Sequence, residues 1–186
     1  VVAPRAAELY DLTLLVPSNI VFEEASGDVI RNFEFCLKRL EAAGVKIKHQ
    51  RLEVFDAMNN SSSVHGTLAT AEAFYSLGQH IDGQQRKRID ERVVDRIEIG
   101  RKQTAFNYIS IREERSNLRQ QLKSNFDGKV FLAMPTVAIT APLIRPLELD
   151  KSLFHSVNST VLRNTMIGNY FDLPGLTLPN GLDRDG

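Results

Sequence analysis

The 186-residue sequence has a single cysteine, no tryptophan and no apolar run close to the ~20 residues that span a bilayer. Cys36 cannot form an internal disulfide, which is typical of a reducing compartment such as the cytoplasm. It falls on the apolar side of an expected helix, so we interpret it as a buried, inert thiol. The N-terminus shows no basic segment followed by an apolar core, as a signal peptide would. We therefore expect a cytoplasmic protein without membrane contact.

Charge of one sign is not in excess, because 23 lysines and arginines balance 23 aspartates and glutamates. No net field favours nucleic acid, so we expect no nucleic-acid partner. The four histidines are scattered without paired helical spacing or a cysteine partner, which argues against a metal site. No glycine-rich run precedes a Lys-Ser or Lys-Thr pair, so a phosphate-binding loop is not expected either.

One local arrangement places serines beside a possible base, at Ser61-Ser62-Ser63-Val64-His65-Gly66. Serine–histidine catalysis also needs a third group to orient the imidazole and an oxyanion hole, and adjacency in sequence supplies neither. We therefore favour a capping or turn role for these serines over a catalytic one.

Apolar runs and helical periodicity alternate along the chain and predict an α/β fold with one domain over residues 1–186. Residues 12–16 form a continuous apolar run ended by Pro17, as in a strand buried on both faces. Ser26 is a natural N-cap for a helix that ends at Gly44, and the strand–helix–strand order predicts parallel strands. Further strands are predicted at 45–52, 130–134 and 176–178, helices at 68–79, 85–99, 104–126 and from about 150, a loop at 59–63 and a helix break at Asp127-Gly128.

The predicted strands are too few to give every interior strand a neighbour on both sides. Residues 12–16 and 176–178 are apolar enough to be interior strands. Sheet edges would then be exposed, and exposed edges promote association. We expect a homo-oligomer, with a dimer as the simplest form.

Several segments match a known family in order and spacing. They are the strand and helix of residues 11–44, Ala-Glu-Ala-Phe-Tyr at 71–75, Arg96 with Gly100 ahead of Phe106, the apolar strand ending in Pro135-Thr136, and Arg163-Asn164-Thr165 followed by Leu-Pro and Pro-Asn-Gly. Together they resemble the amidase signature hydrolases over nearly the whole chain. The resemblance implies a layered mixed β-sheet flanked by helices.

The resemblance also implies a reaction and a place in the enzyme. Members of the family hydrolyse a carboxamide C–N bond by acyl transfer, using a lysine, a bridging serine and a nucleophilic serine from a Gly-Ser-rich region, with no metal or organic cofactor. This chain has no such Gly-Ser-rich segment. We therefore expect it to be the C-terminal portion of an amidase, inactive alone, with the catalytic residues outside it and a small-molecule amide as substrate.

The candidate substrate-binding residues follow from the resemblance and from strand ends. Tyr75, Asn164 and Thr165 match positions that approach the family's active-site cleft, although Asn164 and Thr165 could instead cap or brace the helix end. Arg96 matches a position that lies near a substrate carboxylate in some members, although an ordinary ion pair with Asp95, Glu91 or Glu98 is the favoured alternative. Thr136 follows a strand, as does the Pro17-Ser18-Asn19 segment, and ligands of open α/β sheets gather at such ends.

Two other function classes stay open. The chain could be a non-catalytic α/β binding domain, or the A subunit of a transfer-RNA-dependent amidotransferase. An acidic residue stands in that subunit near the position of Leu162, which argues mildly against the second alternative.

Overall fold

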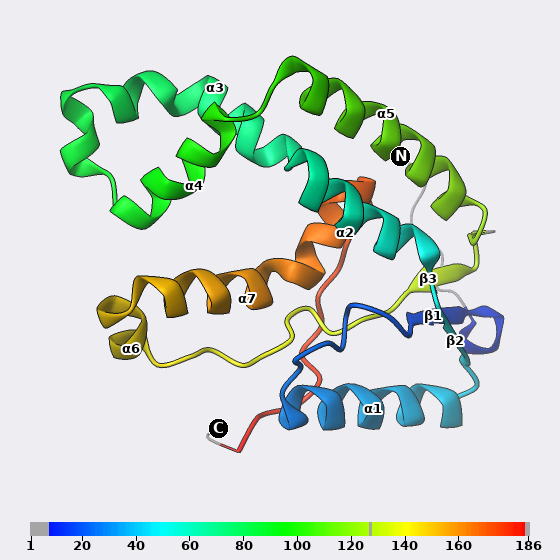
Figure 1. Ribbon diagram of the computed structural model, residues 1–186. Coiled ribbons are helices and arrows are strands. Elements are labelled where there is room, and N and C mark those ends of the chain that lie inside the picture. Colours follow the sequence, from blue (N-terminus) through cyan, green and yellow to red (C-terminus); the bar gives the residue numbers. More distant parts are fainter. Residues whose placement is uncertain (1–7, 127, 185–186) are drawn as a thin grey trace, which may run out of the picture. The chain divides into compact units, whose positions relative to one another are not determined.

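The computed structural model describes residues 8–126 and 128–184, and it contains a parallel sheet of three strands (Figure 1). The strands are β1 (Thr13–Pro17), β2 (Lys46–Gln50) and β3 (Val130–Leu132), in the order β2-β1-β3. Leu15 of β1 aligns with Lys48 on one side and with Leu132 on the other. The predicted α/β class and the parallel arrangement of the first two strands are confirmed.

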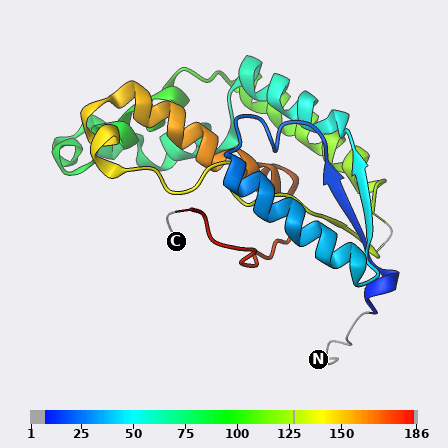
Figure 2. The same ribbon diagram turned by 90° about the horizontal axis from the view of Figure 1, so that it is seen from below.

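Helix α1 (Gly27–Ala42) covers one face of this sheet, and Figure 2 shows it running alongside the strands. It begins where predicted, because the Ser26 side chain accepts a hydrogen bond from the backbone N–H of Val29. Phe33 and Leu37 of α1 pack against Val16 of β1. The chain leaves the helix at Gly44, whose φ of +101° a residue with a side chain rarely adopts.

Most of the remaining chain is helical. The elements are η1 (Leu9–Asp11), α2 (Glu53–His65), α3 (Leu68–Asp82), η2 (Gln84–Arg88), α4 (Glu91–Arg101), α5 (Ala105–Lys123), α6 (Ile144–Leu149) and α7 (Lys151–Phe171). Helix α7 begins after Asp150, whose carboxylate accepts from the N–H of Leu153 at 2.9 Å, as the sequence predicts. None of the helices described is long and apolar enough to cross a membrane.

The chain forms two compact units, and their boundaries fall inside α2 and α5. Unit 1 comprises Val1–Phe55 and Gln121–Gly186, and unit 2 comprises Asp56–Gln120. Unit 1 therefore holds the sheet with α1, α6 and α7, and unit 2 holds α3, η2 and α4. A single domain over the whole chain stays a prediction.

The predicted loop at 59–63 is wrong, because these residues lie inside α2. The run of Asn and Ser favours turns locally. However, Val54, Phe55, Met58 and Ser61 recur at helical spacing and are all buried, so one side of the helix packs. Burial of this side outweighs the local preference. The expected capping or turn role of the serines is wrong for the same reason.

Two further element predictions need correction. The single helix expected at 85–99 is divided into η2 and α4, because the Asp90 side chain accepts from the N–H of Arg92 and caps a new helix. Residues 176–178 form no strand, and Leu176 and Leu178 are 84% and 72% exposed. An extended segment becomes a strand only when another strand accepts its hydrogen bonds. Helix α5 ends at Lys123; Asp127 of the predicted break lies outside the described residues.

Unit 2 is held by the contact between α3 and α4. Ile81 of α3 and Val94 and Ile97 of α4 form its buried apolar cluster. The helices approach so closely at Gly100 that a Cβ there would lie 2.1 Å from the carbonyl oxygen of Thr70. Gly100 is therefore required by the spacing of the two helices.

Candidate functional site

The carboxyl ends of the strands in unit 1 are joined by buried side-chain amides. Asn19, which lies two residues after the end of β1, is only 6% exposed. Its Nδ2 donates to the carbonyl oxygen of Leu52 at 3.1 Å, and its Oδ1 accepts from the N–H of Leu52 at 3.0 Å. This pair of bonds fastens the loop after β1 to the chain leaving β2.

Asn164 of α7 makes the second such connection. It is fully buried, and its Nδ2 donates to the carbonyl oxygens of Val21 at 3.0 Å and Pro135 at 2.9 Å. Its Oδ1 accepts from Nε of Arg163 at 3.3 Å. Asn164 therefore joins two loops to the interior of α7, and it neither caps nor braces the end of the helix. A role toward substrate stays a prediction.

Two of the candidate hydroxyls in unit 1 are exposed. Thr136 directly follows Pro135, and its hydroxyl lies 3.1 Å from that of Thr177. The Thr165 hydroxyl donates to the carbonyl oxygen of Leu162 at 3.0 Å, within its own helix. Both side chains are accessible to a ligand and can exchange these hydrogen bonds for others.

Tyr75 and Arg96 lie in unit 2, on α3 and α4. Tyr75 is 90% exposed, and Arg96 is exposed as well. The ion pair expected between Arg96 and Asp95, Glu91 or Glu98 is not formed among the described residues. Glu91 instead pairs with Arg86. Arg96 therefore projects a positive charge that no acidic side chain of the described chain neutralises.

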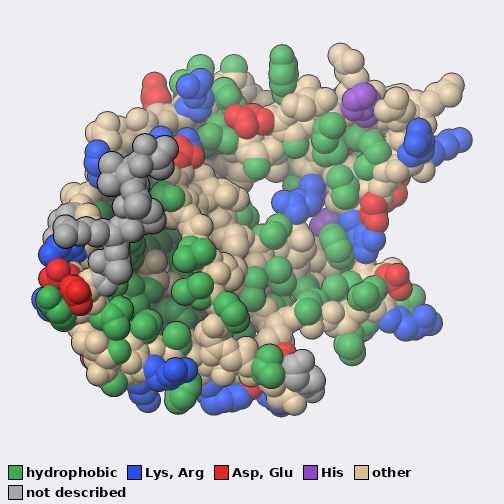
Figure 3. Space-filling view, turned by 180° about the vertical axis from the view of Figure 1, so that it is seen from behind, with side chains coloured by type: hydrophobic (Ala, Val, Ile, Leu, Met, Phe, Trp, Pro, Cys, Tyr) green, Lys and Arg blue, Asp and Glu red, His purple; other side chains and the backbone are tan. Residues whose placement is uncertain are grey.

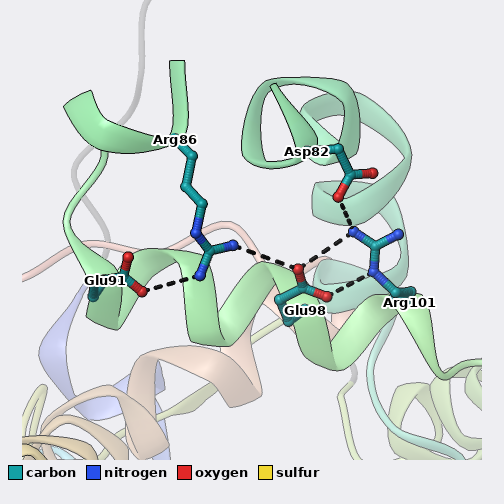
Figure 4. A network of polar contacts seen from close by, with 5 residues as sticks. All are labelled: Asp82, Arg86, Glu91, Glu98 and Arg101. Carbon is teal, nitrogen blue, oxygen red and sulfur yellow. Dashed lines mark hydrogen bonds and ion pairs between the residues drawn. The ribbon is translucent and has the colours of Figure 1, made fainter. Parts of the chain in front are cut away.

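Glu91 and Glu98 of the same helix are engaged in a network that links α3, η2 and α4 (Figure 4). Arg101 binds Asp82 and also Glu98, with 2.7 Å between its Nε and Oε2 of Glu98. Arg86 contacts Glu98 at 3.8 Å from the other side. The hydrogen bond from Arg101 holds the pKa of Glu98 below its usual range, and Glu98 and Asp82 together raise the pKa of Arg101.

A hollow of about 450 Å³ lies in unit 2 beside His65. The Gln103 side chain links two residues beside this hollow. It donates to the carbonyl oxygen of His65 at 2.9 Å and accepts from the Thr70 hydroxyl at 2.7 Å. The His65 ring lies 3.4 Å from the Asn107 amide and 3.8 Å from a carboxylate oxygen of Glu114. Both contacting residues belong to α5, so the His65 imidazole is held against that helix.

The serines beside His65 are arranged as helix residues. The Ser63 hydroxyl donates to the carbonyl oxygen of Asn59 at 2.9 Å, one turn earlier in α2. The Ser61 hydroxyl is buried. Among the described residues no group of three or more His, Cys, Asp or Glu side chains could hold a metal ion. On the face drawn in Figure 3, basic and acidic side chains are interspersed with apolar and other surface.

Sequence reasoning missed the bracing role of Asn19. It placed Pro17-Ser18-Asn19 at a strand end, where a ligand could bind. The available signal was an amide side chain between a buried strand and the apolar pair Ile20-Val21, since a polar group in such a setting must find hydrogen-bond partners. The identity of the partner, Leu52, depends on the tertiary fold.

Comparison with known proteins supplies the family. Residues 2–186 match the family described as Amidase. A curated relative from Comamonas testosteroni, "2-amino-5-chloromuconic acid deaminase", is 26% identical over 187 residues, which cover 98% of this chain and 39% of the relative. The chain thus spans about two fifths of that relative's length. With the match extending over nearly every residue, the chain belongs to the amidase family, as its strand-end and Arg-Asn-Thr motifs indicate.

Proposed function

We propose that the full-length protein containing this chain hydrolyses a carboxamide or related C–N bond and releases ammonia or an amine. The observation that carries the proposal is the family match over residues 2–186. The name of the relative, a deaminase, also describes cleavage of a C–N bond. Because identity to that relative is 26%, the substrate of this protein is a separate question.

The mechanism that we propose is acyl transfer to water by a Ser-Ser-Lys set outside this chain. A lysine kept neutral by burial and neighbouring charges takes a proton, through a bridging serine, from the nucleophilic serine. The nucleophile attacks the amide carbon, the amine leaves with a proton, and water then hydrolyses the acyl-enzyme. Backbone N–H groups stabilise the oxyanion, each by about 3–4 kcal/mol in comparable sites.

In this proposal each unit of the present chain supplies its own candidate substrate-binding groups. Thr136 and Thr165 offer exposed hydroxyls that can donate to or accept from an amide. Tyr75 and Arg96 offer an exposed phenol and an exposed guanidinium, the latter suited to a substrate carboxylate. Asn164 is fully buried and bonded to two carbonyls, so we assign it an indirect role.

The test is to label the full-length protein with a serine-directed fluorophosphonate and map the modified residue by peptide mass spectrometry. Ammonia release from acetamide, benzamide and 2-amino-5-chloromuconic acid is measured in parallel. We expect a single labelled serine outside residues 1–186, with loss of hydrolysis in proportion to labelling. A labelled serine at Ser61, Ser62 or Ser63 would overturn the assignment of the chemistry to another part of the protein.

The matched control is the 186-residue chain alone, under the same conditions. We expect neither labelling nor hydrolysis, because the nucleophile and its lysine are absent. Ammonia release by this chain would contradict the proposal directly, and failure of the full-length protein to hydrolyse any C–N substrate would favour a binding function.

A further inference from the structure

In the loop after β1, hydrogen bonds hold the residues on both sides of one strained residue. Ile20 has a φ of +66°, in the left-handed region, and is 2% exposed. Before it, Asn19 exchanges two hydrogen bonds with Leu52. After it, the carbonyl oxygen of Val21 accepts from Asn164.

This conformation is costly for a β-branched residue, because the left-handed region brings Cβ too close to the following carbonyl oxygen. Such strain persists only where the surrounding structure determines the backbone more strongly than local preference does. Here the side-chain amides of Asn19 and Asn164, together with the burial of Ile20, hold the backbone in this conformation. The loop at the carboxyl end of the central strand is therefore held in one conformation.

The same amide of Asn164 also holds the loop after β3. It donates to the carbonyl oxygen of Pro135, the residue directly before Thr136. One buried nitrogen therefore sets the backbone at the carboxyl ends of two neighbouring strands. Because both amide protons are used and Asn164 has no exposed surface, it has no free group for a ligand.

We propose that Asn164 is a positioning residue, which places the Thr136 hydroxyl toward the substrate by fixing the backbone of Pro135 and Val21. This inference rests on the proposed function, in which Thr136 belongs to the substrate pocket. It goes beyond that proposal because it makes the contributions of Asn164 and Thr136 to substrate binding dependent on each other. Loss of Asn164 should thus affect substrate binding through Thr136 and not through the overall fold alone.

The test is a double-mutant cycle in the full-length protein, with KM and kcat measured for benzamide. Thr136→Val removes the hydroxyl and Thr136→Ser keeps it. Asn164→Ser offers one hydroxyl donor in place of two N–H donors. Should that variant not fold, Asn164→Asp keeps the shape and loses both donors when ionised. Ser159→Ala, on the exposed side of α7, is the control.

We expect Thr136→Val and Asn164→Ser each to raise KM about tenfold with little change in kcat, a loss on the order of one hydrogen bond. Thr136→Ser should keep KM near the wild-type value, and Ser159→Ala should leave KM unchanged. The KM of the double variant should not exceed the higher KM of the two single variants.

The inference would be overturned if the KM increases of the two single variants multiplied in the double variant. It would also be overturned if the Asn164 variant lowered the melting temperature without changing KM. Both outcomes would leave the proposed function standing. An unchanged KM in Thr136→Val would remove Thr136 from the pocket and the inference with it. A wild-type protein that hydrolyses no amide would contradict the proposed function itself, and the inference would fall for that separate reason.

Discussion

Asn19 and Leu52 exchange two hydrogen bonds, one from Nδ2 to the carbonyl oxygen at 3.1 Å and one from the Leu52 N–H to Oδ1 at 3.0 Å. Both residues are buried. The side-chain amide of Asn19 thus makes the hydrogen bonds to the Leu52 backbone that a neighbouring strand would otherwise make. It continues the link between β1 and β2 beyond the last paired residues, Pro17 and Gln50.

Replacement of Asn19 should therefore destabilise unit 1. Asn19→Ala leaves the buried N–H of Leu52 without a partner, while the Leu52 carbonyl keeps the bond from the N–H of Phe55, and one unsatisfied buried group costs about 1–3 kcal/mol. We expect the free energy of unfolding to fall by roughly 1–3 kcal/mol in urea denaturation of the full-length protein. Asn60→Ala, at an exposed position of α2, is the control and should change it by less than about 0.5 kcal/mol. Equal effects of both substitutions would contradict the structural role of Asn19.

Two glycine substitutions should have opposite effects on stability. At Gly100 an added Cβ would lie 2.1 Å from the Thr70 carbonyl oxygen and 2.6 Å from Cβ of Phe74, so α3 and α4 would have to separate. We expect Gly100→Ala to cost about 1–3 kcal/mol or more. Gly168 lies inside α7 with no atom within 4 Å of the added Cβ, so Gly168→Ala should stabilise by about 0.5–1 kcal/mol. Melting temperatures of the two variants check this, and a fall at both positions would show that α7 needs glycine for another reason.

The pKa of Glu98 should depend on Arg101. The hydrogen bond and charge of Arg101 hold this pKa below its usual range, so Arg101→Gln should move it upward toward the value of an ordinary glutamate. Carbon-13 NMR titration of the glutamate carboxyls measures the shift. Arg96→Gln, in the same helix, is the control and should leave the pKa of Glu98 unchanged, because Arg96 contributes no interaction to it.

The same pair gives stability a defined pH dependence. Because the pKa of Glu98 is lower in the folded than in the unfolded state, its contribution is present above the unfolded pKa and is lost as pH falls through the folded pKa. Arg101→Gln should therefore be less stable than wild type at neutral pH, and the difference should shrink in acid. A difference that grows in acid would have the wrong sign.

Arg96 should discriminate substrates by charge if it lies in the pocket. It is exposed and forms no ion pair with an acidic side chain of the described chain. Arg96→Gln should raise KM about tenfold for an amide that carries a carboxylate, equivalent to about 1.4 kcal/mol, and leave KM for a neutral amide unchanged. Arg112→Gln, at an exposed position of α5, serves as the control. Equal KM changes for charged and neutral amides would remove Arg96 from carboxylate binding.

The elements predicted most accurately are those whose local signals and burial agree. Helix α1 has its N-cap at Ser26, its apolar residues Phe33 and Leu37 on one side, and Gly44 at its end. The family was likewise recognisable, because short motifs kept their order along the chain. Prediction failed at 59–63 and at 176–178, where local preference and tertiary context disagree.

The amino-acid sequence by itself determined the α/β class, the start of α1 and α7, and the family, since each depends on residues that are near one another in the chain or on their order. The tertiary structure decided which groups meet. Asn164 finds the carbonyls of Val21 and Pro135, 143 and 29 residues away in the chain, and Asn19 finds Leu52 across 33 residues. No periodicity specifies such pairs, because a buried amide accepts any partner that the folded backbone brings within hydrogen-bonding distance.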